Sequence, residues 1–301
     1  MDLDPTAEQI ALQEAVSAVC ARHHDADLLG ALDAAGYLDV VHDAGPLEGV
    51  MVVERAAEAL ASGPIAARVL AGAIAGVHDL PPAVGLVVGT GPAMCRWAPE
   101  CDAFLVLDGG RALLAARGDV DVTPVDSSFG ATYGWVTVRH GAPVASGDAL
   151  RRGWQVAIAA EAGATMLAAI NKTAQHVSAR HQFGRPIGAF QAVQHRLATA
   201  YAMAMGTRWL ARRGAWYADD EFVTASAAAY GCEAALVTYT NTHQVTGAIG
   251  ITSEYGLVDW TTRLLGMRQE LGGQRAHARR VAAVRRSAPH PWPSPLPLPA
   301  G

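Results

Sequence analysis

Charged residues are scarce in this 301-residue chain, at 17%, and aromatic residues are scarcer still, at 6%. The formal net charge of -5 argues against broad binding to nucleic acid, whose phosphates need a basic surface. No uninterrupted apolar run has membrane-spanning length, and the acidic start, MDLDPTAEQI, lacks the apolar segment of a secretion signal. We therefore expect a soluble cytoplasmic protein with no nucleic-acid or membrane partner.

Cysteine is also rare. The four cysteines lack the spacing of a metal site, and Cys95 and Cys101 have no second pair nearby. Buried free thiols are the better interpretation, and no metal is expected. Apolar residues are plentiful instead, at 51%, with abundant alanine and glycine, which indicates a sizeable core of closely packed helices.

Helical periodicity dominates residues 1–78, which we interpret as an N-terminal helical domain. Thr6 is a candidate N-cap with Gln9 three residues later, and apolar residues follow at helical spacing. Further along, Glu54 and Glu58 share one face of an expected helix. Because the opposite face is apolar, we interpret these two carboxylates as part of a solvated face rather than an acid–base pair.

The pattern changes at residues 79–147, for which we predict a small, truncated β domain. Short apolar runs (VGLVV, FLVL, ALLAA, VDVTPV and WVTV) alternate with turns such as Asp108-Gly109-Gly110. Helical spacing then returns over residues 148–287, which predicts a C-terminal helical bundle, and the proline-rich residues 288–301 are expected to form a tail. The fold class is therefore predicted to be mainly α with a small β domain.

The most distinctive stretch, residues 179–198, reads ARHQFGRPIGAFQAVQHRLA. Helical spacing continues to Arg180, a glycine and a proline then stop the helix, and a second helix starts near Phe190. We expect two long helices joined by a short corner that holds Arg180, Gln182 and Phe183.

This stretch resembles the acyl-CoA dehydrogenase family, in which an R-x-x-F-G turn precedes an F-Q-x-x-Q-x-x-L-A helix. The matching residues are Arg180, Phe183, Gly184, Phe190, Gln191, Gln194, Leu197 and Ala198. The resemblance implies an acyl-CoA dehydrogenase fold with a C-terminal four-helix bundle. It also implies that Arg180, Gln182, Phe183 and Gln191 reach the ADP half of FAD in a partner subunit. A guanidinium offers a fork of donors to a pyrophosphate, whereas the alternative is an arginine that caps its own helix.

A second stretch, HQVTGAIGITSEYGLVDWTTR, is similar to the family's Q-x-x-G-G-x-G turn with its following E-Y and arginine. Gln244, Gly247 and Arg263 fit that pattern, while Ala248 replaces one glycine. The resemblance implies that Gln244 and Gly247 touch the partner's adenosine, where glycine lets the backbone approach a ligand closely. An ordinary helix end is the alternative.

The catalytic base of the family is missing. By the resemblance, the glutamate that removes the α proton of an acyl thioester falls at Gly272, and the base of a second family branch falls at Trp154. Neither side chain can accept a proton. The weak substitutes are Glu270, expected on a different face of the turn, and Glu161. Glu161 is a candidate for a buried carboxylate with a raised pKa, but structural hydrogen bonding is the preferred interpretation.

The β domain also lacks the family's T-E-x-x-x-G-S-D segment and its flavin-stacking tryptophan. The resemblance therefore implies a subunit without catalytic residues that completes the FAD site of a homologous, longer acyl-CoA dehydrogenase subunit. We expect a heterotetramer with two copies of each chain and an acyl-CoA substrate held mainly by the partner. A steroid side chain is a candidate acyl group, and electron-transfer flavoprotein is a candidate acceptor.

Two other hypotheses stay open. One is a self-sufficient homo-oligomeric acyl-CoA dehydrogenase whose base has moved to Glu270 or Glu161. The other is a scaffold or binding protein with no redox role on the same fold.

The last predicted helix is crowded with arginines, and Arg279 falls where the family has another arginine. We interpret the run as a solvated helix edge, with phosphate or partner contact as a secondary role. The run consists of Arg275, Arg279, Arg280, Arg285 and Arg286.

Overall fold

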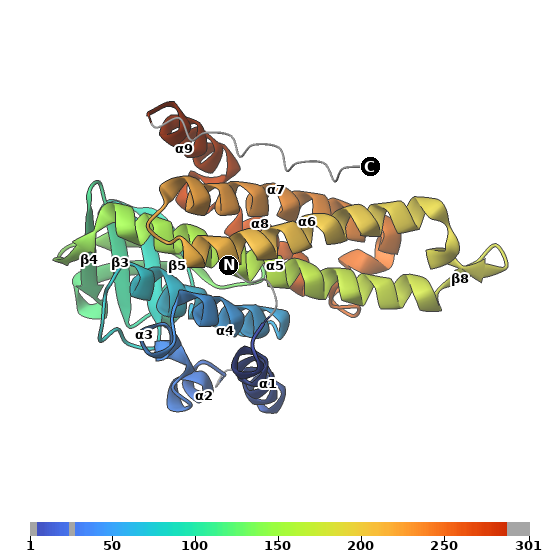
Figure 1. Ribbon diagram of the computed structural model, residues 1–301, viewed down its shortest axis with the longest axis horizontal. Helices are drawn as coiled ribbons and strands as arrows, with labels where there is room; N and C mark the ends of the chain where they lie inside the picture. Colours follow the sequence, from blue (N-terminus) through green and yellow to red (C-terminus); the bar gives the residue numbers. More distant parts are fainter. Residues whose placement is uncertain (1–4, 24–27, 288–301) are drawn as a thin grey trace, which may run out of the picture.

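The computed structural model describes residues 5–23 and 28–287, so the predicted tail at 288–301 lies outside the described residues. Long helices run side by side along the molecule, and a small β region lies beside one end of them (Figure 1). The fold is mainly α with a small β domain, as predicted.

The N-terminal region is helical. Thr6 accepts a hydrogen bond from the backbone of Gln9 at 3.2 Å, and the Gln9 side chain accepts one from the backbone of Thr6 at 3.0 Å, which is the predicted cap. A turn of π-helix, Ala67–Gly72, leads towards the β region. The helices are α1 (Ala7–Arg22), α2 (Leu28–Ala34), α3 (Val40–Asp43) and α4 (Pro46–Glu58).

The β region contains two small sheets. One has the order β1-β3-β4-β7 with β1 parallel to β3, and the other is antiparallel with the order β2-β6-β5. Each of the five predicted runs is a strand, and Gly109, at φ 58°, makes the predicted turn between β3 and β4. The strands are β1 (Val84–Val88), β2 (Ala93–Arg96), β3 (Ala103–Asp108), β4 (Arg111–Ala116), β5 (Val120–Val125), β6 (Tyr133–Val138) and β7 (Ala142–Ser146).

The C-terminal region is a bundle built on α5. This helix is long and apolar enough to cross a membrane, but 94% of its most apolar window is buried inside the protein, as in a core helix. Gly163 allows close packing of α6, because a Cβ there would lie 3.2 Å from the Arg208 backbone. The helices are α5 (Gly147–Ala179), α6 (Gln191–Trp216), α7 (Glu221–Thr246), α8 (Leu257–Met267) and α9 (Gly273–Ser287).

The interpretation of Glu54 as part of a solvated face is wrong. Glu54 is fully buried, and its carboxylate pairs with Arg212 at 2.7 Å and with Arg208 at 3.0 Å. Both arginines belong to α6, which packs against α4, so this buried charge is compensated between two helices far apart in the sequence. Glu58 remains partly exposed and pairs with Arg55 on its own helix.

The cysteines behave as predicted. All four are free and buried. Burial raises the pKa of Cys95 and of Cys232 to about 12, so these thiols stay protonated and unreactive near neutral pH.

Candidate functional site

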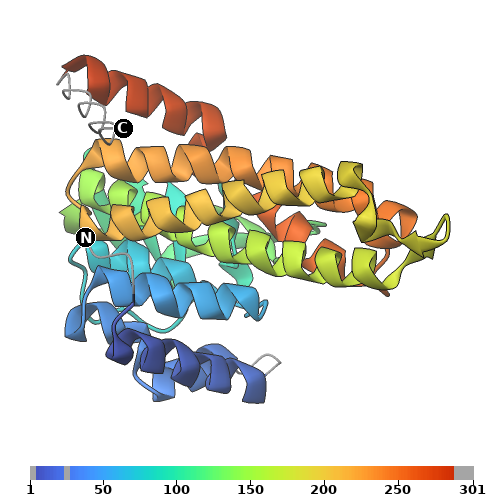
Figure 2. The ribbon, with the colours of Figure 1, turned by 45° about the vertical axis from the view of Figure 1, so that its right-hand side comes forward.

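The predicted flavin-contact residues of the hairpin lie on a projecting arm, which we define as the end of α5, the β8–β9 turn and the first turns of α6 (residues 174–199). Figures 1 and 2 both show this arm extending past the rest of the bundle. At its tip, β8 (His181–Gln182) pairs with β9 (Arg185–Pro186). The corner predicted from the sequence is therefore a tight β turn between two helices.

Phe183 occupies an unusual position in this turn. Its φ is 53° and that of Gly184 is 78°, a left-handed pair that suits glycine but is uncommon for phenylalanine. Phe183 is 90% exposed, and its ring lies edge-on to Phe190 with ring centroids 6.1 Å apart. A strained backbone that presents an exposed aromatic ring is a feature that often marks a binding site.

Arg180 directly follows α5. Its backbone N–H donates to the His176 carbonyl at 2.8 Å, and its own carbonyl accepts from Ile187 at 2.8 Å. Its exposed guanidinium makes no hydrogen bond or ion pair within residues 5–23 and 28–287. The arginine therefore does not use its side chain to cap α5, and its donors face solvent.

The remaining predicted contacts lie nearby. Gln191 is the first residue of α6 and is exposed, and Gln182 donates to the His181 carbonyl at 2.7 Å. Gln244 is exposed in the last turn of α7, and Gly247 ends that helix with φ 64°.

A hydrogen bond links the end of α7 to the arm. The Arg196 guanidinium on α6 donates to Asn241 Oδ1 on α7 at 3.1 Å. The rings of His176 on the arm and Tyr255 of the second stretch also lie with centroids 5.3 Å apart, so the two stretches are in contact.

The two residues at which the resemblance places a base lie elsewhere, in a partly open cavity of about 250 Å³ that we call the central cavity. It is lined by the first half of α5, by β1 and β2, and by the segment between α8 and α9. Gly272 and Trp154 both line it, as do Arg96, Glu161 and Glu270. Glu270, expected on a different face of the turn from the vacant place, lines the same cavity as Gly272.

Arg96 holds both candidate carboxylates. Its Nη1 and Nη2 donate to the two oxygens of Glu161 at 2.6 and 2.7 Å, and its Nε donates to Glu270 at 2.9 Å. The indole of Trp154 donates to the other Glu270 oxygen at 2.5 Å. We call these four residues the Arg96 cluster.

The cluster gives Glu161 the structural hydrogen bonding that was its preferred interpretation, and its electrostatics contradict the alternative of a raised pKa. Burial by itself would raise the pKa of Glu161, but the charge and paired hydrogen bonds of Arg96 outweigh it, and the pKa is lowered. A carboxylate that is held charged by a bidentate guanidinium is a weak proton acceptor with its oxygens already occupied. The chemistry of a general base is therefore suppressed at this position.

The lining of the central cavity offers a flavin dehydrogenase no free base, because both of its carboxylates are bonded to Arg96. The exposed donors of the arm, in contrast, suit the pyrophosphate of an FAD held by another chain.

The sequence analysis missed Arg96. The residue lies in the short strand β2, and its partners Glu161 and Glu270 follow 65 and 174 residues later. A single arginine in an otherwise apolar strand was the one local signal that it needed a buried partner.

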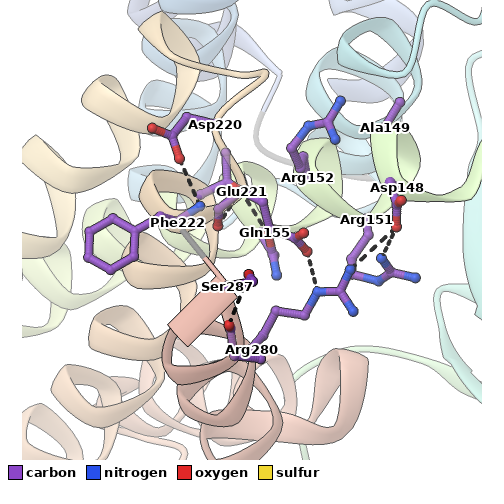
Figure 3. A network of polar contacts seen from close by, with 12 residues as sticks. Asp148, Ala149, Arg151, Arg152, Gln155, Asp220, Glu221, Phe222, Arg280 and Ser287 are labelled. Carbon is purple, nitrogen blue, oxygen red and sulfur yellow. Dashed lines mark hydrogen bonds and ion pairs between the residues drawn. The ribbon is translucent and has the colours of Figure 1, made fainter. Parts of the chain in front are cut away.

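A second polar network holds α9 against the bundle (Figure 3). Arg280 pairs with Glu221 of α7 and, at 3.3 Å, with Asp148 of α5, which also pairs with Arg151. The interpretation of the arginine run as a solvated edge is therefore wrong for Arg280, which is half-buried, whereas the other four arginines are exposed.

Comparison with known proteins points to one family. Residues 151–285 match the family model for the acyl-CoA dehydrogenase C-terminal domain. The chain is 31% identical over 237 residues to acyl-CoA dehydrogenase FadE34 of Mycobacterium tuberculosis, which covers 75% of this chain. The matched part spans only 33% of that relative.

Solved structures share the fold. A chain of the ChsE4-ChsE5 complex from Mycobacterium tuberculosis has a TM-score of 0.79 at 23% identity, covering 97% of this chain and 100% of that one. A chain of the Tcur3481-Tcur3483 steroid ACAD G363A variant has a TM-score of 0.79 at 19% identity, covering 94% and 99%.

Proposed function

Because the chain belongs to the acyl-CoA dehydrogenase family, we propose that it is a non-catalytic subunit that completes the FAD site of a homologous, longer acyl-CoA dehydrogenase subunit. The assembled enzyme introduces an α,β double bond into an acyl-CoA thioester. FAD, when bound, accepts the hydride from the β carbon, and the partner supplies the base that removes the α proton.

One observation carries this proposal: the central cavity has no residue placed to act as a base. By the resemblance, the two family base positions fall at Gly272 and Trp154, and both residues line the cavity. The only carboxylates found in the lining of the cavity, Glu161 and Glu270, are both bonded to Arg96. A general base must be free to take a proton from the substrate carbon, and neither carboxylate is free.

The arm supports the proposal that this chain completes the FAD site of a partner subunit. Arg180 presents donors that no described residue occupies, and Phe183 is held outwards by a strained turn. Gln191, Gln244 and Gly247 lie at the same end of the bundle. Such a surface suits the ADP half of an FAD whose flavin ring lies in a partner subunit.

The structural neighbours suggest the kind of assembly. Two of them are named as complexes of unlike chains, and one of these is described as a steroid acyl-CoA dehydrogenase. By analogy, we place this chain in a cytoplasmic heterotetramer with two copies of each chain that acts on a steroid-side-chain thioester. Electron-transfer flavoprotein is the proposed acceptor.

The flavin content of the assembly tests the proposal. The chain is expressed alone and together with dehydrogenase-like chains encoded next to it. The ratio of FAD to protein is then measured in each purified species. We expect little FAD on the chain alone and one FAD for each pair of unlike chains in the complex. A homo-oligomer with one tightly held FAD per chain would contradict the proposal.

A second candidate is a homo-oligomeric enzyme that uses Glu270, because that carboxylate lines the same cavity as Gly272. A purified single chain that is yellow and oxidises acyl-CoA would favour it. A flavin-free complex would instead favour a scaffold without a redox role.

A further inference from the structure

Two buried side chains of the central cavity carry unused hydrogen-bonding groups. Trp97 and Tyr133 both line the cavity and are only 6% and 8% exposed. The indole Nε1 of Trp97 and the hydroxyl oxygen of Tyr133 have no hydrogen-bond partner among the described residues. Most buried polar atoms in folded proteins are paired, so two unpaired atoms in the wall of one cavity require an explanation. A ligand that accepts hydrogen bonds is one such explanation.

Trp97 is held in the cavity wall by a strained backbone. Its φ is 64°, in the left-handed region that a bulky residue rarely adopts. Its backbone N–H donates to the Thr132 carbonyl at 2.8 Å, and its own carbonyl accepts from the Glu100 N–H at 3.0 Å. The Arg263 guanidinium lies over the indole ring, 5.3 Å from the ring centroid. Backbone strain that neighbouring groups hold in place often marks a binding site.

Tyr133 lies where strand β6 approaches α8. Gly266 of α8 also lines the cavity, and a Cβ at that position would collide with the Tyr133 hydroxyl. The glycine therefore leaves the space that the hydroxyl occupies. Burial raises the pKa of Tyr133, so the hydroxyl stays protonated near neutral pH and is able to donate a hydrogen bond.

The charges around the cavity balance one another. Arg96 is paired with Glu161 and Glu270. Arg263 is 5% exposed and adds a second positive charge, which acts on Glu161. A charged ligand would bring a further charge into this space without a counter-ion, which is costly. The ligand that fits is therefore neutral. The rest of the lining is mainly apolar, and includes Val84, Leu86 and Ile158.

We propose that the central cavity binds a small neutral ring compound whose carbonyl oxygen accepts hydrogen bonds from Trp97 and Tyr133. A carbonyl oxygen suits this wall because an indole N–H can only donate, and the oxygen has two lone pairs. A dry cavity of roughly 150 Å³ holds one benzene ring, so about 250 Å³ leaves room for a single ring with its carbonyl group. Met94 lines the cavity and is 43% exposed, which places an opening beside it.

This binding activity lies beyond the proposed function. The ligand carries neither a phosphate nor a thioester, so it differs in class from the substrate of the assembled enzyme. Trp97 and Tyr133 are also not among the residues that match the family motifs. The chain would hold this compound without oxidising it.

The indole N–H signal of Trp97 reports on the site. The chain has seven tryptophans, and the Trp97 signal is the one missing from the nitrogen-15 NMR spectrum of Trp97→Phe. The full-length chain is titrated with cyclohexanone and with methylenecyclohexane, which has a CH₂ group in place of the oxygen. Cyclohexanone should bind about 5–150-fold more tightly, because it alone pairs the buried donors, and it should shift the Trp97 signal.

Two tyrosine variants provide a matched pair. Tyr133→Phe removes only the hydroxyl, so the affinity for cyclohexanone should fall at least about fivefold and that for methylenecyclohexane should stay within about twofold. Tyr217→Phe makes the same change at a tyrosine that is 46% exposed and outside the cavity lining, and should leave both affinities within about twofold. Equal losses in the two variants would overturn the site.

The stability of Tyr133→Phe checks that the hydroxyl has no partner in the chain. Removal of an unpaired buried hydroxyl relieves its desolvation, so the urea midpoint of this variant should be no lower than that of the parent chain. A lower midpoint would mean that the hydroxyl is already bonded, and would overturn the proposal. Equal affinity of the parent chain for the two compounds, or binding of neither, would show that water alone meets the donors and would also overturn it.

The inference can fail independently of the proposed function. Tyr133→Phe should leave FAD retention in the heteromeric complex unchanged, and Arg180→Ala should leave cyclohexanone binding unchanged. Loss of FAD retention in Tyr133→Phe would instead assign the cavity to the flavin, and this site would be wrong.

Discussion

The arm and the central cavity lie at different parts of the long helix α5, and each contains an arginine. The two arginines differ in whether their side chains are already bonded within the chain. Arg180 follows the end of α5 and points its donors into solvent. Arg96 lies against the first half of α5, and its guanidinium is ion-paired with both Glu161 and Glu270. The same functional group is available to a partner in one region and occupied in the other, because burial and neighbouring carboxylates differ.

This difference separates binding from chemistry within the chain. The arm keeps the family motif and leaves the Arg180 guanidinium without a partner among the described residues, beside a strained Phe183. The cavity lacks the family base and satisfies its own charges internally. A substitution in the cavity should therefore alter folding, whereas one in the arm should alter ligand retention.

The largest expected effect is on the folding stability of the cavity. Arg96→Ala leaves Glu161 and Glu270 without their counter-ion in a buried site, and breaking such a pair costs ~3–5 kcal/mol. Arg180→Ala removes an exposed side chain and should change the free energy of unfolding by less than about 0.5 kcal/mol. Urea denaturation of the two variants measures both. Equal stabilities would show that the cluster is solvated rather than buried.

Acid should lower the free energy of unfolding of the chain. Burial lowers the pKa of His277 from 6.5 to about 4, so the unfolded chain binds a proton in this range that the folded chain does not. The contribution of neutral His277 to the free energy of unfolding is complete above pH 6.5. It falls by up to about 3 kcal/mol as the pH decreases to 4. The lowered pKa of Glu161 acts in the same direction below its usual value of 4.5.

The control for this acid effect is His277→Gln, which removes the titrating ring. Urea midpoints at pH 7.5, 5.5 and 4 should depend less on pH in the variant than in the parent chain. An identical pH dependence in the two proteins would exclude His277 as the source.

Flavin retention is the next effect in size. Arg180→Ala should weaken FAD binding by the assembled complex by ~1.5–3 kcal/mol, or about 10–150-fold, because a charge-assisted bond to the pyrophosphate is lost. Arg180→Lys should restore only part of this, since an ammonium lacks the fork of donors. Oligomer size should not change, because the apolar residues Val177 and Val193 are untouched. Unchanged FAD dissociation would remove the main support for the cross-subunit role.

The smallest effect is expected from the two carboxylates. Glu270→Gln and Glu161→Gln should each leave turnover of the complex within about tenfold of normal, because neither carboxylate is free to act as base. Removal of a true general base costs ~10²–10⁴-fold. A loss of that size with normal FAD content and assembly would place the base in this chain and abolish the contrast between the two regions.

The sequence by itself determined the local features. Helical spacing, the Thr6–Gln9 cap and the Asp108-Gly109-Gly110 turn all depend on neighbours within a few residues, and the structure confirms them. The hairpin motif and the glycine at position 272 can also be recognised from the sequence, because recognising them requires only the identity and order of the residues. The roles assigned to Arg180 and its neighbours remain predictions.

Only the tertiary structure decided the state of the charges. Glu54 looked solvated and is buried between two arginines of α6. For Glu161 the sequence left open a raised pKa beside the preferred structural hydrogen bonding, and its contact with Arg96 lowers the pKa instead. Glu270 proved to share the cavity with Gly272. Backbone preference is set by nearby residues, but a carboxylate's charge is set by the groups within a few ångströms, and here these come from strands and helices 65 to 174 residues away.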